Sequence, residues 1–315
     1  MQYRKLGSTD LTVSALGFGG SPLGGGFRTV DESEAIRTVH TALDLGINFI
    51  DTSPYYGVTR SETLLGKALR SVPRDRYVLA TKVGRYGMDD FDFSASRVTR
   101  SVDESLARLG VDAIDLIQCH DIEFGSLDQV VNETLPALRR LRDAGKVRWI
   151  GITGLPLKIY RYVLERTGVD TILSYCHYAL NDTSLETLLP TLTAKQLGII
   201  NASPLSMGLL TDRGAPDWHP ASPEIRRVCA AAAQACRQQG LDIQKLAVQF
   251  SVSNPAIHTT LVGSANPENM RRNVEWVESP IDAQALATVQ ALLAPIHNQT
   301  WLSGRPENND PIPAA

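Results

Sequence analysis

The chain has 315 residues, of which 43% are hydrophobic and 21% charged, and its formal net charge is −3. Its 31 basic and 34 acidic residues form no run of one sign, which argues against a binding surface for nucleic acid or for an anionic membrane. No apolar stretch approaches the roughly 20 residues of a membrane-spanning helix. Four cysteines are too few for a disulfide framework, and the first residues lack the pattern of a secretory signal, so we expect a cytoplasmic protein.

Short β-rich runs alternate with longer segments along the whole chain. The longer segments carry apolar residues at spacings of three to four, as in the stripe of Ala35, Val39 and Leu43, which is typical of helices packed on one face. Strands separated by helices predict parallel βαβ units. The predicted strands are Ser14–Gly19, Ile47–Asp51, Tyr77–Lys82, Ala113–His120, Val147–Ile152, Thr171–Tyr175, Gly198–Ala202 and His258–Val262.

Such a chain forms either an open doubly wound sheet or a closed barrel. An open nucleotide-binding sheet would place G-x-G-x-x-G between its first strand and its first helix. Here glycines are spread from Gly17 to Gly26, and the first helix begins near Asp31. Eight evenly spaced strands over about 250 residues favour the barrel. We therefore predict an α/β protein with a (β/α)8 TIM barrel, in which residues 1–315 form a single domain.

Additional segments flank the predicted barrel. Residues 4–14 alternate apolar and polar residues around a turn at Gly7–Asp10, which predicts an N-terminal β-hairpin at the bottom of the barrel. The longest irregular stretch, Ser203–Pro223, follows the seventh strand, and loops of this length are usually functional. A helix and a loop-like tail containing Trp301 are expected at the C-terminal end.

Three successive predicted strands each have a polar residue at the C-terminal end. Asp51 ends the second strand and is followed by Tyr55 and Tyr56, while Lys82 ends the third and His120 the fourth. Functional groups of a barrel come from the C-terminal ends of its strands, so these side chains can converge. An ammonium group lowers the pKa of a nearby phenol from about 10. We expect Lys82 to activate a tyrosine, Asp51 to hold Lys82, and His120 to contact the substrate oxygen. The set predicts proton transfer at a carbinol oxygen while a bound cofactor carries the hydride.

Several motifs occur in a fixed order along nearly the whole chain. They are Leu16-Gly-Phe-Gly19, Asn48-Phe-Ile-Asp-Thr-Ser-Pro-Tyr-Tyr-Gly57, Ala80-Thr-Lys82, Asp115-Leu-Ile-Gln-Cys-His120, Gly145-Lys-Val-Arg-Trp-Ile-Gly151, Ser203-Pro-Leu205 and Gly263-Ser264. In kind and order these motifs resemble the aldo-keto reductase family. The resemblance implies a catalytic tetrad of Asp51, Tyr56, Lys82 and His120. Tyr56 and not Tyr55 matches the catalytic tyrosine, because it directly precedes Gly57.

Further segments narrow the resemblance. They include His120-Asp-Ile-Glu-Phe-Gly-Ser-Leu-Asp128, Ser174-Tyr-Cys-His-Tyr178, Trp218-His-Pro-Ala-Ser-Pro223 and Asn298-Gln-Thr-Trp301. These segments are similar to the L-galactose dehydrogenase and L-fucose dehydrogenase branch of the family. That similarity implies an NAD(P)-dependent sugar dehydrogenase. Such an enzyme oxidises the anomeric C1 of an L-sugar, of the L-galactose, L-fucose and D-arabinose class, to the aldonolactone by hydride transfer.

The resemblance also implies where a nicotinamide nucleotide binds. Thr153 matches a serine that holds the carboxamide, while Gly154 and Ala202 replace the family's usual asparagine and stacking aromatic residue. Gly263 and Asn269 stand where NADPH-preferring relatives place Lys and Arg, so we expect NAD in preference to NADP. The implied nucleotide contacts are Thr153, Ser174, Ser203, Leu205, Gly208, Gly263, Ser264, Asn269, Arg272 and Asn273.

A small uncharged sugar is the expected substrate, with Asp121, His177 and Trp301 as its candidate contacts and no metal site. Two other functions remain open. The first is a broad NADPH-dependent reductase of aldehydes and ketones, against which the missing cations at Gly263 and Asn269 argue. The second is a non-enzymatic, redox-sensing subunit that binds a nicotinamide nucleotide, which an intact tetrad does not exclude.

Overall fold

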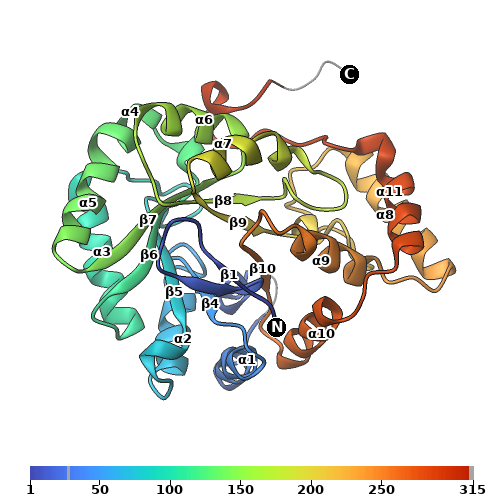
Figure 1. Cartoon of the computed structure of the whole chain (residues 1–315), viewed down its shortest axis with the longest axis horizontal. Coiled ribbons are helices and arrows are strands. Elements are labelled where there is room, and N and C mark those ends of the chain that lie inside the picture. The colour runs from blue at the N-terminus through green and yellow to red at the C-terminus, as the bar shows by residue number, and fades with distance from the viewer. Residues whose placement is uncertain (27–28, 312–315) are drawn as a thin grey trace.

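A closed barrel of eight parallel strands forms the centre of the computed structural model, which describes residues 1–26 and 29–311. The strands follow one another in chain order, and β10 closes on β3 with Gly263 opposite Gly19. Helices surround the strands (Figure 1). The barrel strands are β3 (Leu16–Gly19), β4 (Phe49–Asp51), β5 (Val78–Val83), β6 (Ile114–Cys119), β7 (Val147–Gly154), β8 (Thr171–Tyr175), β9 (Gly198–Ala202) and β10 (Thr259–Gly263). The predicted (β/α)8 TIM barrel is confirmed, and strand ends differ from the predicted ones by at most two residues.

Several of the surrounding helices begin at a capping side chain. Asp31 accepts a hydrogen bond from the backbone N of Glu34 at the start of α1, where the sequence predicts the first helix. Such a cap stabilises a helix by about 0.5–2 kcal/mol. The helices are α1 (Glu32–Asp44), α2 (Arg60–Leu69), α3 (Ala95–Leu109), α4 (Leu127–Gln129), α5 (Leu135–Asp143), α6 (Leu157–Arg166), α7 (Leu189–Ala194), α8 (Pro223–Gln238), α9 (Ile243–Ser253), α10 (Pro267–Glu278) and α11 (Ala283–Leu293). Within the described ranges, no helix combines the length and the apolar character needed to cross a bilayer.

The N-terminal hairpin closes one end of the barrel. Its strands β1 (Tyr3–Lys5) and β2 (Thr12–Ser14) pair antiparallel, and the hairpin lies beside β4 and β10 (Figure 1). Leu6, Leu11 and Val13 pack against the apolar residues inside the barrel. These interior residues are Phe49, Val78, Ala80, Leu116, Leu173, Ile200 and Leu261. The carboxyl ends of the strands therefore form the open end of the barrel, which we call the mouth.

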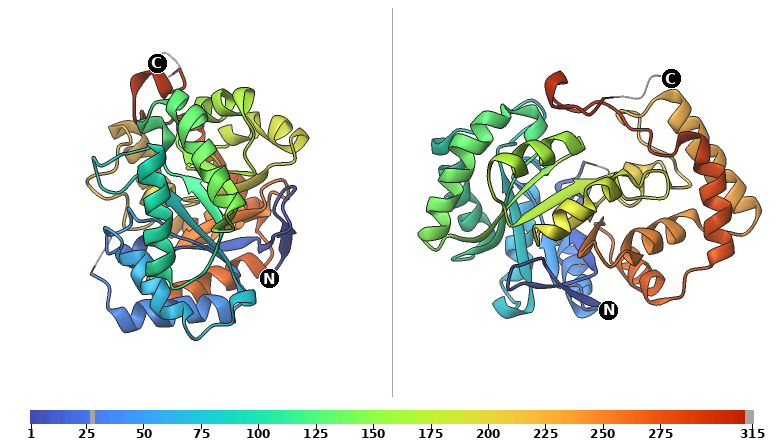
Figure 2. Two further views of the ribbon diagram at one scale, coloured as in Figure 1. Left: turned by 90° about the vertical axis from the view of Figure 1, so that its left-hand side faces the viewer. Right: turned by 45° about the horizontal axis from the view of Figure 1, so that its top comes forward.

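The C-terminal tail follows α11 and reaches the opposite side of the molecule. In Figures 1 and 2 it passes from α11 toward α6 as the red segment. The backbone N of Arg305 donates to the carbonyl O of Glu123 at 2.9 Å, and Asn308 Nδ2 donates to the same oxygen at 2.8 Å. Asp310 pairs with Arg161 of α6 at 3.2 Å. The tail is therefore fixed where β6 and β7 end, at the mouth.

Candidate active site

One residue at the end of each barrel strand faces the mouth. Side chains alternate between the two faces of a strand, so a residue two positions beyond an interior residue also points inward. Asp51 follows the interior residue Phe49 in this way, and Lys82 follows Ala80. The inward residues at the mouth are Gly19, Asp51, Lys82, His120, Thr153, Tyr175, Ala202 and Gly263.

Lys82 connects the first three members of the predicted tetrad. Its Nζ donates to the carboxylate of Asp51, to the carbonyl O of Thr52 at 2.9 Å, and to the Tyr56 hydroxyl at 3.3 Å. The second oxygen of Asp51 accepts from Gln118 Nε2 at 2.9 Å. Lys82 and Asp51 are almost completely buried, so this ion pair is shielded from water. Its position is fixed by bonds from three strands.

The protonation of Tyr56 differs from the sequence-based prediction, whereas that of Lys82 agrees with it. Burial lowers the pKa of Lys82, but Asp51 and Tyr56 raise it by more, and the result is a raised pKa and an ammonium group. The Lys82 ammonium lowers the pKa of Tyr56, as predicted. Burial of the phenol has the larger effect, however, and raises the pKa of Tyr56 to about 12. Tyr56 is therefore a neutral phenol in the unliganded protein and holds a proton that it can donate.

His120 faces Tyr56 edge-on, with a ring-centroid separation of 5.6 Å. Its Nδ1 lies 2.9 Å from the Ser53 hydroxyl, and its Nε2 lies 3.6 Å from an Asp121 carboxylate oxygen. Burial, supported by the nearby Lys82 and Arg85 cations, lowers the pKa of His120 to about 3 although Asp121 opposes this. The ring is therefore neutral. Because the ionised Asp121 carboxylate beside Nε2 can only accept, we place the ring proton on Nε2, and Nδ1 then accepts from the Ser53 hydroxyl.

The comparison with known proteins agrees with this geometry. A model of the aldo/keto reductase family matches residues 15–294. The chain belongs to this family. It is 53% identical to an L-galactose dehydrogenase of Arabidopsis thaliana over 98% of this chain and 99% of that protein. It is 34% identical to a D-arabinose 1-dehydrogenase of Saccharomyces cerevisiae over 97% and 98% of the two chains.

A solved aldo-keto reductase of Bacillus halodurans in its holo form is 29% identical and covers 93% of this chain and 96% of its own, with a TM-score of 0.76. The protein is thus an oxidoreductase of a family that uses nicotinamide cofactors.

Three neighbouring strands of this aldo/keto reductase end in small inward residues beside the tetrad. The last inward residues of three neighbouring strands, β9, β10 and β3, are Ala202, Gly263 and Gly19. A Cβ atom at Gly263 would lie 2.8 Å from Pro22 Cδ, so this position accepts no larger residue without a shift of Pro22. The small residues lie on one half of the mouth, and Asp51 and Lys82 on the other. The residues present therefore fit a nicotinamide ring.

At the ends of β7 and β8, Gly154 and Ser174 face away from the mouth, whereas Thr153 and Tyr175 face it. Thr153 points into the mouth and accepts from the backbone N of Asp121 at 3.1 Å. Ser174, by contrast, lies beside Tyr160 of α6, on the outer face of the barrel, so the structure does not bring this predicted nucleotide contact to the mouth. The inward residue of β8 is Tyr175. Gly154 also faces outward, and a Cβ there would lie 2.3 Å from Glu123 Oε2. Glycine is therefore required at this position by packing.

The predicted phosphate loop after β9 is tightly folded. Ser203, Ser206 and Met207 have positive φ angles, as has Gly208, and a backbone bond of 2.8 Å joins Ser206 N to Ser203 O. The Ser206 hydroxyl donates to Asn181 Oδ1 at 2.6 Å. These contacts fix the segment that contains the predicted contacts Ser203, Leu205 and Gly208.

The remaining predicted nucleotide contacts lie at the start of α10. Asn266 caps this helix, and the hydroxyl of Ser264 accepts from the backbone N of Asn266 at 3.0 Å. Asn269 and Arg272 are exposed, with Arg272 Nη2 at 3.3 Å from Asn269 Oδ1. Asn273 follows on the same helix and is partly exposed. A helix N-terminus favours anions, which suits the phosphates of a nucleotide.

The three predicted substrate contacts have different environments. Asp121 lies beside His120 at the mouth. His177 is buried, with Nδ1 at 3.1 Å from Asp182 Oδ2 and 2.8 Å from the Ser184 hydroxyl. Trp301 packs edge-on against His219 with a centroid separation of 4.8 Å. The structure therefore places Asp121 next to the tetrad and shows no contact of the other two with it.

Sequence reasoning missed several residues that shape the site. Gln118 stands two residues before His120, so its inward direction could have been inferred from strand alternation. Ser53 lies within the motif that contains Asp51. Arg85 and Glu123 have no such signal, because they come from loops whose course depends on the tertiary structure.

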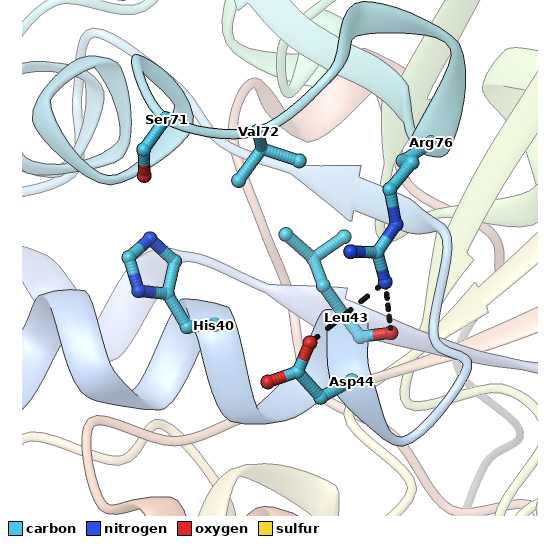
Figure 3. A pocket seen from close by; sticks show the side chains of 6 residues that line it. All are labelled: His40, Leu43, Asp44, Ser71, Val72 and Arg76. Atoms are coloured by element: carbon cyan, nitrogen blue, oxygen red, sulfur yellow. Dashed lines mark hydrogen bonds and ion pairs between the residues drawn. The ribbon is translucent and has the colours of Figure 1, made fainter.

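A surface hollow lies between the C-terminal part of α1 and the segment that joins α2 to β5 (Figure 3). Its lining includes His40, Asp44 and Arg76, and these groups are mostly paired. His40 Nε2 lies 2.8 Å from the carbonyl O of Ala68, and Arg76 lies 3.8 Å from Asp44. No group of three or more potential metal ligands occurs among residues 1–26 and 29–311.

Proposed function

We propose that the protein is a sugar dehydrogenase that oxidises the anomeric carbon of an aldose to the aldonolactone, with NAD as the preferred nucleotide and NADP as the second. L-Galactose, L-fucose and D-arabinose are the proposed substrate class. The observation that carries the proposal is the buried Lys82 ammonium, which contacts Asp51 and Tyr56 while His120 faces the same phenol. The 53% identity to an L-galactose dehydrogenase supports the choice of sugar.

The residues of the tetrad perform the proton transfer in this proposal. The Tyr56 oxygen takes the proton of the anomeric hydroxyl, and Lys82 stabilises the phenolate that forms. The N–H at His120 Nε2 donates to the same substrate oxygen and orients it. When bound, oxidised nicotinamide supplies the hydride acceptor and a positive charge. A positive charge beside the phenol favours the phenolate, which offsets the effect of burial on the pKa of Tyr56.

The nucleotide is held along one side of the mouth. Thr153 contacts the carboxamide, and the segment with Ser203, Leu205 and Gly208 covers the diphosphate. Gly263 and Ser264 bring the N-terminus of α10 to the phosphates. Asn269, Arg272 and Asn273 contact the adenosine. NAD is preferred because a 2′-phosphate would forfeit charge-assisted hydrogen bonds at Gly263 and Asn269.

Asp121, His177 and Trp301 are proposed to contact the sugar away from C1. Asp121 is the best supported of the three, because it lies 3.6 Å from His120 Nε2.

A panel of aldoses with NAD⁺ and NADP⁺, followed by absorbance of the reduced nucleotide, tests the proposal. Reduction of a simple aldehyde with NADPH is measured in parallel. We expect oxidation of L-galactose and L-fucose with NAD⁺ at rates above aldehyde reduction. Absence of aldose oxidation with either nucleotide would exclude the sugar dehydrogenase. Aldehyde reduction alone would point to a general reductase, and nucleotide binding without turnover to a redox-sensing subunit.

A further inference from the structure

Arg85 is held rigidly at the mouth by aromatic rings. It lies two residues beyond β5, and its guanidinium carbon is 3.8 Å from the centroid of the Tyr55 ring. The rings of Phe91 and Phe124 lie at 5.1 and 5.4 Å, and these two rings stack on each other. The Arg85 side chain is only 13% exposed. A guanidinium that is stacked in this way has lost most of its rotational freedom before any ligand binds.

The charge of Arg85 is directed at Asp121. Nη1 donates to Asp121 Oδ2 at 2.6 Å, and the same carboxylate oxygen lies 3.6 Å from His120 Nε2. Asp121 has a left-handed backbone conformation, with φ 48° and ψ 57°, and its backbone N donates to the Thr153 hydroxyl. Such a conformation is costly for a non-glycine residue and is typically retained where function requires it. The carboxylate is thus fixed by a strained backbone and by a rigid cation.

The Asp121 carboxylate stays ionised although it is buried. Burial raises its pKa, but the Arg85 and Lys82 cations and the hydrogen bond from Arg85 act against burial, and the pKa is lowered overall. No group among the described residues donates to Oδ1, the oxygen that Arg85 does not use. An ionised carboxylate in a shielded site accepts hydroxyl hydrogen bonds strongly and repels anionic ligands. The position therefore suits a neutral ligand with a hydroxyl group.

The position of Asp121 relative to His120 indicates which hydroxyl of the substrate donates to the carboxylate. Tyr56 and His120 face the place proposed for the reacting oxygen, and Asp121 Oδ2 lies 3.6 Å from His120 Nε2. Two oxygens on neighbouring carbons of one sugar are close enough together to contact the His120 and Asp121 side chains at the same time. The hydroxyl next to the reacting carbon can therefore donate to Asp121 while His120 donates to the reacting oxygen.

We propose that Arg85 is a positioning residue that aims Asp121 at the hydroxyl adjacent to the reacting carbon, so that the protein selects substrates with a vicinal hydroxyl over their 2-deoxy counterparts. This inference deepens the proposed function and rests on its site. Lysine cannot replace Arg85, because an ammonium group lacks the planar surface that stacks on Tyr55 while pairing with a carboxylate.

The test compares L-galactose with 2-deoxy-L-galactose in the wild type, Asp121→Asn and Arg85→Lys. The wild type should prefer L-galactose by about 10- to 100-fold in kcat/KM, the effect of a hydrogen bond to a charged group. Both variants should lose most of this preference, because kcat/KM should fall further for L-galactose than for the 2-deoxy sugar. If Arg85 had a merely structural role, Arg85→Lys would lower kcat/KM for both sugars by the same factor. That result would overturn the inference.

Arg166→Lys is the matched control. Arg166 stacks on Tyr162 at 3.6 Å and pairs with Glu165, but it lies at the C-terminal end of α6, away from the mouth. This variant should keep the wild-type preference between the two sugars.

Two further measurements separate the inference from the proposed function. If the wild type oxidises no aldose, the dehydrogenase proposal fails. The inference then still predicts faster NADPH-dependent reduction of glyceraldehyde than of propanal, and loss of this difference in Arg85→Lys. Calorimetry on the NADH-loaded wild type should show tighter binding of L-galactose than of its 2-deoxy form. Equal binding, or binding of neither sugar, contradicts the role of Arg85 and Asp121.

Discussion

The Tyr56 hydroxyl lies 3.3 Å from Lys82 Nζ, whereas the neighbouring Tyr55 directs its ring under Arg85. Two adjacent tyrosines thus have different functions in the proposed site. Tyr56→Phe should lower kcat by about 10²- to 10⁴-fold, the usual contribution of a general acid or base. Steady-state rates measure this loss, and a fluorescence titration should show unchanged nucleotide affinity. Tyr55→Phe is the matched comparison and should lose far less. Equal losses would place the proton transfer elsewhere.

The raised pKa of Tyr56 predicts different pH dependences for the two directions of the reaction. A phenol with a pKa of about 12 is protonated at neutral pH. Reduction, which needs the proton, should therefore be insensitive to pH between about 6 and 8, while sugar oxidation, which needs the phenolate, should accelerate as the pH rises. Rates over a pH series measure both directions. An oxidation rate that is constant in this range would show that another group takes the proton.

The buried pair of Lys82 and Asp51 predicts a large stability effect. Lys82→Met leaves a buried carboxylate without its cation, which typically costs about 3–5 kcal/mol. Unfolding in urea should therefore show a lower free energy of unfolding for Lys82→Met. The double variant Lys82→Met/Asp51→Asn removes both charges and should recover part of the loss. A double variant as unstable as the single one would mean that the charges do not cause the effect.

The raised pKa of Glu123 predicts that the free energy of unfolding falls as the pH rises. Its carboxyl is buried beside Asp121, with Oε1 at 2.9 Å from the Ser303 hydroxyl, and burial followed by the Asp121 charge raises its pKa to about 8. In the unfolded chain the pKa is about 4.3. Between these values the folded state holds a proton that the unfolded state lacks. The contribution is therefore complete below about pH 4 and is lost as the pH rises to about 8, by about 1.4 kcal/mol per pH unit.

The variant Glu123→Gln should remove this slope, as measured by urea unfolding at several pH values from 5 to 8. Glu165→Gln is the control, because Glu165 is 71% exposed, and it should keep the wild-type slope. An unchanged slope in Glu123→Gln would show that Glu123 titrates normally.

The exposed position of Asn269 predicts a simple change of nucleotide preference. Asn269→Arg adds a cation on α10 without a steric conflict, whereas a side chain at Gly263 would meet Pro22. A hydrogen bond between Arg and the 2′-phosphate should raise kcat/KM for NADP⁺ about 10- to 100-fold and leave that for NAD⁺ nearly unchanged. Rates with the two nucleotides measure the ratio. Gln284→Arg, an exposed change on α11, should leave it unaltered.

The sequence by itself determined the elements and the tetrad. Local patterns predicted the strands within two residues, and they placed Asp51, Lys82 and His120 at or next to strand ends, where parallel strands bring them together; Tyr56 was predicted from the resemblance to the family. The same alternation along a strand could have predicted that Ser174 points outward, because its neighbour Tyr175 points inward.

Only the tertiary structure decided the charges and the loops. The pKa of Tyr56 depends on how much water the whole fold excludes, because burial raises this pKa while Lys82 lowers it. The aromatic enclosure of Arg85 and the docking of the tail on Glu123 join segments that are far apart in the chain. Contacts of this kind arise from packing between loops, for which the sequence carries no local periodicity.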